Sequence, residues 1–134
     1  MAGTLTIDTL KTSSGVFSSQ NAITGIPNAW VNWSSSTNTP TIKGSFNVSS
    51  ITGVATGLYT VNFTTALPSA NYTMAGSCSQ SSTSTTNFSI VSIASATNLG
   101  TPTTKTTTAC QVVTSGYGGN FATIGDISAT FVGG

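Results

Sequence analysis

Apolar and polar residues alternate along most of this chain, with the two-residue period that is typical of β-strands. In residues 121–132, for example, Ile127, Ala129 and Phe131 alternate with polar neighbours. No apolar period of 3.6 residues, the pattern of an amphipathic helix, extends over more than one turn. The sequence therefore predicts an all-β protein, an antiparallel β-sandwich of about eight or nine strands.

Four predicted strands follow one another between residues 29 and 77, a region that contains both tryptophans and two of the three tyrosines. They span residues 29–33, 41–49, 58–64 and 72–77. The polar stretch 34–40 and the glycine-containing stretch 53–57 are expected to form turns. Each strand has one apolar and one polar side, which predicts an antiparallel meander with one buried face.

The alternation within this region divides its aromatic residues between core and surface. Trp33, Phe46, Tyr59 and Phe63 fall on inward positions and are expected in the core. Trp30 falls on the face opposite Trp33. Because an indole is costly to leave in water, Trp30 is expected to pack against a second sheet or to fill a subunit contact. It is the first candidate contact residue.

Before residue 29 the pattern predicts a short segment of extended pieces and a connector. A strand, a turn and a second short extended piece are expected at residues 4–10, 11–15 and 16–17. An irregular connector follows, and Pro27 and Asn28 close it. We therefore divide the chain into an N-terminal strand-and-connector segment, residues 1–28, and a sandwich domain, residues 29–134.

After residue 77 the chain alternates between polar loops and further predicted strands. Strands are expected at residues 88–93, 101–113 and 121–132, the second of them because threonine favours strands over helices. The glycine-rich loop 116–120 presents Tyr117. Tyrosine among Ser, Gly and Asn is the composition of adaptable recognition loops, so Tyr117 is the second candidate contact residue. The alternative is a loop tip without a binding role.

Charged residues are very few, and this changes the expected surface. Apart from Asp8, Lys11, Lys43, Lys105 and Asp126, the polar residues are uncharged, with 21 serines, 27 threonines and ten asparagines. Strand edges are normally guarded by lysine, proline or inward charges. Three lysines are too few to protect every strand edge of such a protein from pairing with other chains. This favours an oligomer over a free monomer whose surface is hydrated through its hydroxyl groups.

The composition also argues against two kinds of partner. The absence of a basic cluster argues against binding of nucleic acid, and no apolar run is long enough to span a membrane.

Conventional catalytic and metal-binding groups are also scarce. Without histidine or glutamate, a general base would have to be Asp8 or Asp126, and each is more simply a turn cap or a solvated residue. Two cysteines are too few for a zinc site, and no loop carries the carboxylates of a calcium site. We expect no enzyme activity, no catalytic residue, no metal and no cofactor. Cys78 and Cys110 could form a disulfide, but a chain without a visible secretory signal is expected to keep them as buried thiols.

Two segments carry a resemblance to a known family. The first is GTLTIDTLKTSSG at residues 3–15. The second is AWVNW at residues 29–33, followed by SFNVSSITGVATGLYTVNFTTALPSANYTM at residues 45–74. Both resemble short virion proteins of tailed bacteriophages, of the tail-fibre-like or capsid-decoration type. Trp33 stands where that family has phenylalanine. The resemblance covers about half of the chain.

This resemblance implies a non-enzymatic structural protein on the outer surface of a virion, assembled in the cytoplasm of the bacterial host. Such a protein would form a homotrimer and bind other virion proteins of the capsid or tail, with residues 1–28 as its docking segment. It would stabilise the particle, contact the host surface, where a glycan is the candidate partner, or do both. Whether it belongs to head or tail is left open. The alternative is a free carbohydrate-binding module or adhesin that uses Trp30 and Tyr117.

Overall fold

The computed structural model describes residue 3 and residues 9–12, 15–18, 26–36, 38–79, 90–93, 105–115, 121 and 125–133. Ten strands lie in these ranges and no helix does. They are β1 (Thr9–Thr12), β2 (Gly15–Ser18), β3 (Pro27–Ser36), β4 (Thr39–Phe46), β5 (Val48–Ala55), β6 (Leu58–Phe63), β7 (Thr73–Cys78), β8 (Ile90–Ile93), β9 (Ala109–Ser115) and β10 (Asp126–Val132).

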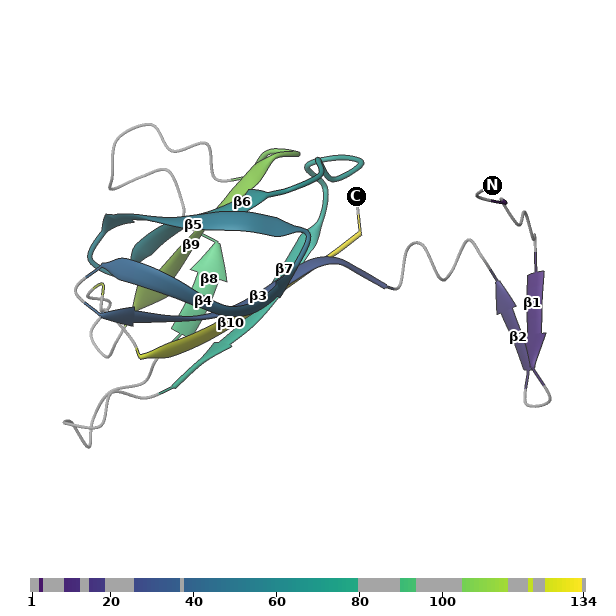
Figure 1. The fold of residues 1–134 in the computed structure, drawn as a ribbon, viewed down its shortest axis with the longest axis horizontal. Helices are drawn as coiled ribbons and strands as arrows, with labels where there is room; N and C mark the ends of the chain where they lie inside the picture. The colour runs from purple at the N-terminus through teal and green to yellow at the C-terminus, as the bar shows by residue number, and fades with distance from the viewer. Residues whose placement is uncertain are drawn as a thin grey trace.

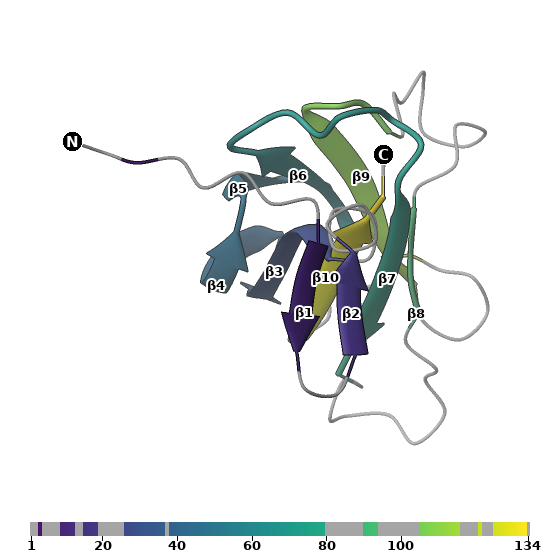
Figure 2. The same ribbon diagram turned by 90° about the vertical axis from the view of Figure 1, so that its right-hand side faces the viewer.

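Eight of these strands form two four-stranded antiparallel sheets. The first sheet has the order β4-β3-β10-β7, and the second has the order β5-β6-β9-β8. The two sheets lie face to face (Figure 1), so the predicted all-β antiparallel sandwich is confirmed. Strands β1 and β2 pair with each other as a separate hairpin, which is drawn beyond the end of the sandwich (Figures 1 and 2).

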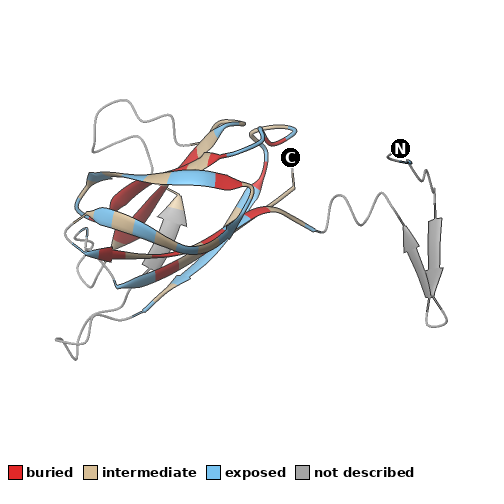
Figure 3. Cartoon of the chain, viewed as in Figure 1, coloured by how far each residue is buried: buried red, intermediate tan, exposed pale blue. Residues whose placement is uncertain are grey.

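The core fills the space between the sheets, and both sheets contribute to it (Figure 3). From the first sheet it takes Trp33, Ile127 and Phe131, and from the second it takes Tyr59 and Phe63, all at most 7% exposed. Its aromatic rings meet edge to face, the preferred geometry of such pairs: the Trp33 and Tyr59 centroids lie 5.9 Å apart, and those of Phe63 and Phe131 lie 5.1 Å apart. The inward assignments of Trp33, Tyr59 and Phe63 are confirmed.

The predicted strand at residues 41–49 is two strands in different sheets. Strand β4 ends at Phe46, β5 begins at Val48, and Asn47 between them has a positive φ of 55°. Asparagine tolerates this left-handed conformation better than most residues, and it lets the chain turn from one sheet into the other. The four central strands are therefore not a meander in one sheet, because β3 and β4 belong to the first sheet and β5 and β6 to the second.

Phe46 does not lie in the core, contrary to the prediction from alternation. It is 55% exposed, while Ile42 faces Trp33 on the core side. The β3–β4 register explains the difference: Trp33 pairs with Ile42 but Asn32 pairs with Gly44, so Lys43 is an extra residue in a β-bulge. One added residue reverses the faces of all positions that follow it in the strand.

Several predicted boundaries are also wrong. Strand β3 continues to Ser36 and β4 starts at Thr39, so the expected turn at 34–40 shrinks to the residues between them, and Asn38 has a positive φ of 63°. Strand β5 runs to Ala55, which leaves a tight turn at Thr56–Gly57 instead of a hairpin connection over 53–57. Near the N-terminus, β1 and β2 occupy most of the expected turn 11–15, while residues 4–8 lie outside the described ranges.

Both cysteines are free thiols. Cys110 is fully buried, and Cys78 is half-buried at the edge of the core. Burial raises the pKa of each thiol above its ordinary value. In the part of the chain that the structure describes, no helix is long and apolar enough to cross a membrane.

Candidate functional site

Trp30 and Phe46 form an exposed aromatic pair on the outer face of the first sheet. They are directly opposite each other in the β3–β4 register, and they are 42% and 55% exposed. Residues paired across an antiparallel ladder have neighbouring side chains on the same face. Strand β3 places Trp30 outward because Ala29 and Val31 on either side of it are buried, and the bulge at Lys43 places Phe46 beside it.

The Trp30 indole packs against the backbone of Gly44. A Cβ atom at Gly44 would lie 3.6 Å from both Cζ3 and Cη2 of Trp30, so the outer part of the ring packs across the glycine backbone. This contact supports one part of the indole, while 42% of the residue remains in contact with solvent. One part of the Trp30 ring therefore packs against the protein, and the other part is exposed to solvent. No second sheet covers the ring among the described residues.

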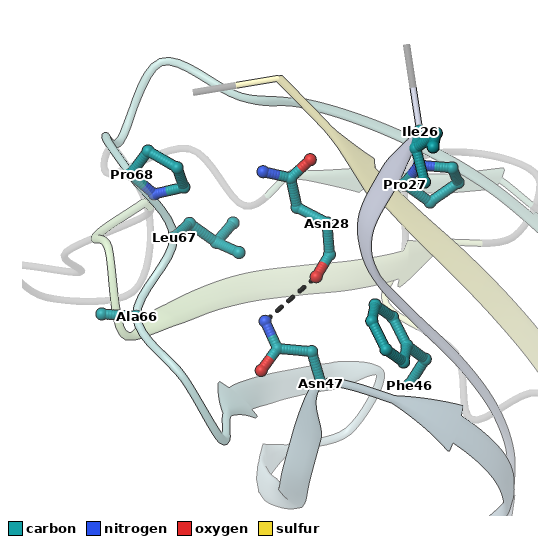
Figure 4. Close-up of a pocket in the computed structure, with 8 residues that line it drawn as sticks. All are labelled: Ile26, Pro27, Asn28, Phe46, Asn47, Ala66, Leu67 and Pro68. Atoms are coloured by element: carbon teal, nitrogen blue, oxygen red, sulfur yellow. Dashed lines mark hydrogen bonds between the residues drawn. The ribbon is translucent and has the colours of Figure 1, made fainter. Parts of the chain in front are cut away.

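A hollow of about 330 Å³ adjoins this pair at the end of the sandwich where β3 begins (Figure 4). Phe46 belongs to its wall. The other lining residues come from the start of β3, the β4–β5 corner and the loop after β6, and they are Ile26, Pro27, Asn28, Asn47, Ala66, Leu67 and Pro68. The hollow is mostly apolar and open, with Ile26 52% exposed and Leu67 buried in its wall.

Asn47 holds the three lining segments together. Its side-chain Nδ2 donates to the carbonyl oxygens of Asn28 at 3.0 Å and Thr65 at 3.1 Å, and its Oδ1 accepts from the Thr65 backbone N–H at 2.8 Å. The Asn47 carbonyl also accepts from the Thr64 N–H at 3.1 Å. These bonds connect β3, the β4–β5 corner and the loop after β6. They therefore fix the relative positions of the backbone segments that line the hollow.

The Asn28 side chain is the polar group that remains available in the hollow. Its amide extends into the open space between Pro68 and Pro27 (Figure 4), and it has no hydrogen-bond partner among the described residues. A primary amide offers one acceptor and two donors. The hollow therefore combines apolar walls, an aromatic ring and one free neutral amide, the usual composition of a small-ligand site.

The charged residues of the described sandwich lie away from the hollow lining. Lys43 and Asp126 form an exposed ion pair between β4 and β10. Lys105 Nζ donates to the Tyr72 carbonyl at 2.9 Å and lies 5.1 Å from the centre of the Tyr72 ring. No charged residue lines the hollow, which therefore offers a neutral surface.

Among the described residues, Tyr72 is the titratable group with the largest pKa shift, and its surroundings give it a structural role. The ring packs edge to face against Phe63 and Phe131, and its hydroxyl donates to the Ala109 carbonyl at 3.1 Å. Burial is the main cause that raises the pKa of Tyr72 far above its ordinary value, and the neighbouring Cys110 thiol adds to it. A phenol that keeps its proton and is hydrogen-bonded to backbone stabilises the core.

The candidate residues from the sequence are not brought together in one described site. Trp30 is exposed on the outer face, whereas Tyr117 and Asp8 lie outside the described residues. Asp126 is engaged with Lys43. Within the described ranges, no cluster of three His, Cys, Asp or Glu side chains could hold a metal ion.

Sequence reasoning missed Phe46, Ile26 and Asn28 as surface residues. The position of Phe46 depends on a bulge that alternation alone does not reveal. Ile26 and Asn28 stand in a predicted connector, where no helix or strand period predicts which way a side chain points. The Ile-Pro-Asn sequence marks a chain boundary but not the hollow that forms there.

Comparisons of the chain with protein-family models, with curated protein sequences and with solved structures found no match.

Proposed function

We propose that this chain is a non-enzymatic structural protein on the outer surface of a tailed-bacteriophage virion, where it stabilises the particle, contacts the host surface or does both. In this proposal the chain forms a homotrimer and binds capsid or tail proteins of the same particle. The sequence resemblance is the basis for the class of protein, and head and tail positions are equally compatible with it.

The observation that carries the assembly part of this proposal is the edge strand β7. It pairs with β10 on one side, and among the described residues no strand of the first sheet pairs with its other side, although β7 lies close to β8 of the second sheet. Its sequence TMAGSC contains no charge and no proline, and its register has no bulge. An edge of this kind is a template for pairing with another chain. The opposite edge strand, β4, is guarded by Pro40 and by the bulged Lys43.

The β1–β2 hairpin supports a docking role for the N-terminal segment. Its described backbone is paired only within the hairpin, with Thr9 opposite Ser18 and Thr12 opposite Gly15. A two-stranded hairpin is marginally stable in water without a surface to pack against. Contact with another virion protein would supply that surface, in agreement with the proposed division of the chain at residue 28.

The alternative function is a free carbohydrate-binding module or adhesin. The exposed Trp30–Phe46 pair favours it, because aromatic faces beside neutral polar groups suit sugar rings. The two functions differ in assembly. The alternative needs only a monomer, whereas the virion protein needs stable contacts with other chains.

Light scattering on the purified chain, together with peptide mapping of purified virions, tests the proposal. We expect a trimeric mass at micromolar concentration and peptides of the chain in intact particles. An Ala75→Lys substitution, which puts a charge on the edge strand β7, should shift the mass toward the monomer. Thr41→Lys on the guarded edge strand β4 is the matched control and should leave the mass unchanged. A monomeric wild-type chain that is absent from virions would refute the proposal.

A further inference from the structure

We infer that the hollow beside Phe46, together with the exposed face of Trp30, is a binding site for a neutral saccharide. One sugar ring would lie in the hollow against Phe46 and hydrogen-bond to the Asn28 amide, and the next ring would stack on Trp30. This inference rests on the proposed contact with a host surface and specifies the chemistry of that contact.

The available polar chemistry selects a neutral ligand. The free Asn28 amide can donate and accept at once, as the hydroxyl groups of a sugar require. Phosphate or carboxylate ligands need a cationic or bidentate partner, and no lysine lines the hollow. Lys43, the one cationic residue of strand β4, is already paired with Asp126. An anionic ligand would therefore lose its hydration without compensation.

The apolar chemistry selects a ligand with flat C–H faces. Phe46 forms one wall of the hollow, and Leu67 and Pro68 form the opposite side (Figure 4). Sugar rings present C–H groups on their faces and hydroxyl groups around their rims, so they satisfy apolar walls and a single amide together. Trp30 continues the aromatic surface from Phe46 across the β3–β4 pair, which extends the site beyond one ring.

The site is preorganised, which favours binding of a small ligand. The Asn47 hydrogen bonds fix the backbone around the hollow, and Gly44 supports the Trp30 indole. Little ordering of the protein is then needed when a ligand binds, and this lowers the entropic cost of binding.

The size of the patch favours a saccharide over a protein partner. Ile26, Trp30 and Phe46 are each about half exposed, and together they present roughly 300 Å² of apolar surface. A stable protein interface buries roughly 800 Å² on each partner. In addition, the patch lies at the β4 side of the first sheet, opposite the β7 edge that we assign to assembly. Both surfaces can therefore be used in the same particle.

The test is binding of the 134-residue chain to an array of neutral and acidic bacterial surface polysaccharides, followed by titration of the bound sugar. We expect binding to neutral glycans only, with a blue shift of tryptophan emission from Trp30, since Trp33 is already buried. Asn28→Ala and Phe46→Ala should each weaken binding by about tenfold or more. Both variants should fold normally, because the Asn28 side-chain amide has no hydrogen-bond partner among the described residues and Phe46 is half exposed.

Val54→Ser is the matched control, because Val54 is also 52% exposed but belongs to the second sheet. It should leave both binding and emission unchanged. No binding to any glycan, preferential binding to acidic glycans, or binding that survives Asn28→Ala and Phe46→Ala would each overturn the inference. Loss of the trimer in Phe46→Ala would also overturn it and identify the patch as a subunit contact. Peptide mapping of virions is independent of these outcomes and reports on the proposed function alone.

Discussion

Phe46 lies opposite Trp30 on the solvent-facing side of the first sheet, although Ile42, four residues earlier in the same strand, faces the core beside Trp33. The bulge at Lys43 produces this arrangement by adding one residue to β4. The two tryptophans of the chain therefore have opposite roles. Trp33 is fully buried between the sheets, while Trp30 is open to solvent.

This difference predicts unequal effects of removing each indole. Trp33→Ala leaves a cavity in the core and should lower the free energy of unfolding by about 3–5 kcal/mol. Trp30→Ala should change it by less than about 1 kcal/mol, because the side chain is already half hydrated. Urea unfolding followed by circular dichroism measures both. Equal losses in the two variants would show that Trp30 is part of the core.

Asn47 is predicted to be critical for joining the two sheets. Asn47→Ala removes its three side-chain hydrogen bonds and places alanine at a φ of 55°, and it should cost about 3 kcal/mol of unfolding free energy. Asn47→Gly also removes the bonds but adopts the positive φ freely, so its cost should be about 1 kcal/mol smaller. Thermal unfolding of both variants, with the exposed Asn71→Ala as control, measures the difference. The reverse order would contradict the conformational part of the explanation.

Two buried tyrosines are predicted to respond in opposite directions to loss of the hydroxyl group. The Tyr59 hydroxyl is buried and has no hydrogen-bond partner among the described residues, so Tyr59→Phe should raise the unfolding free energy by about 1 kcal/mol. The Tyr72 hydroxyl donates to Ala109, so Tyr72→Phe should lower it by a similar amount. Urea midpoints of the two variants check this directly. Destabilisation by Tyr59→Phe would imply a partner for that hydroxyl, such as an ordered water.

Stability is predicted to be insensitive to pH near neutrality and to fall in alkali. The chain has no histidine, so no side chain with an ordinary pKa titrates between about pH 5 and 8. Burial raises the pKa of Cys78, Cys110 and Tyr72 in the folded protein, from ordinary values of 9.0 for the thiols and 10.0 for the phenol. Above pH 9 the unfolded chain then releases protons that the folded chain retains, so the free energy of unfolding decreases.

The contributions of the two cysteines and of Tyr72 to this pH dependence of stability can be measured separately. Replacement of Cys78 and Cys110 by serine should remove the decrease that begins near pH 9 and leave the later one from Tyr72. Tyr72→Phe should have the complementary effect above pH 10. Denaturant midpoints measured from pH 6 to 11 provide the test. A profile that rises with pH in this range would be contrary to the linkage argument.

Much of the fold could be predicted because buried and exposed residues alternate regularly in the strands that contribute most to the core. The inward positions of Ala29, Val31 and Trp33 follow from simple alternation, and so do those of Ile127 and Phe131. These strands, β3 and β10, are paired neighbours at the centre of the first sheet. A central strand with one buried face leaves a clear two-residue pattern in the sequence.

The candidate site could not be predicted, because each of its parts depends on an irregularity. Phe46 is exposed through one bulged residue, and the hollow exists because Asn47 turns the chain between sheets with a positive φ. Asn28 acquires its position only when the loop that contains Leu67 and Pro68 packs across from it. Such long-range contacts leave no period in the sequence.

Immunogold labelling of intact virions is the most direct test of the central claim that this chain is displayed on a phage particle. Antibodies raised against the purified chain should decorate the particle surface at regular positions on the head or the tail. Antibodies preabsorbed with the chain provide the control for specificity. Absence of label from intact particles, with the chain also missing from disrupted ones, would contradict the account.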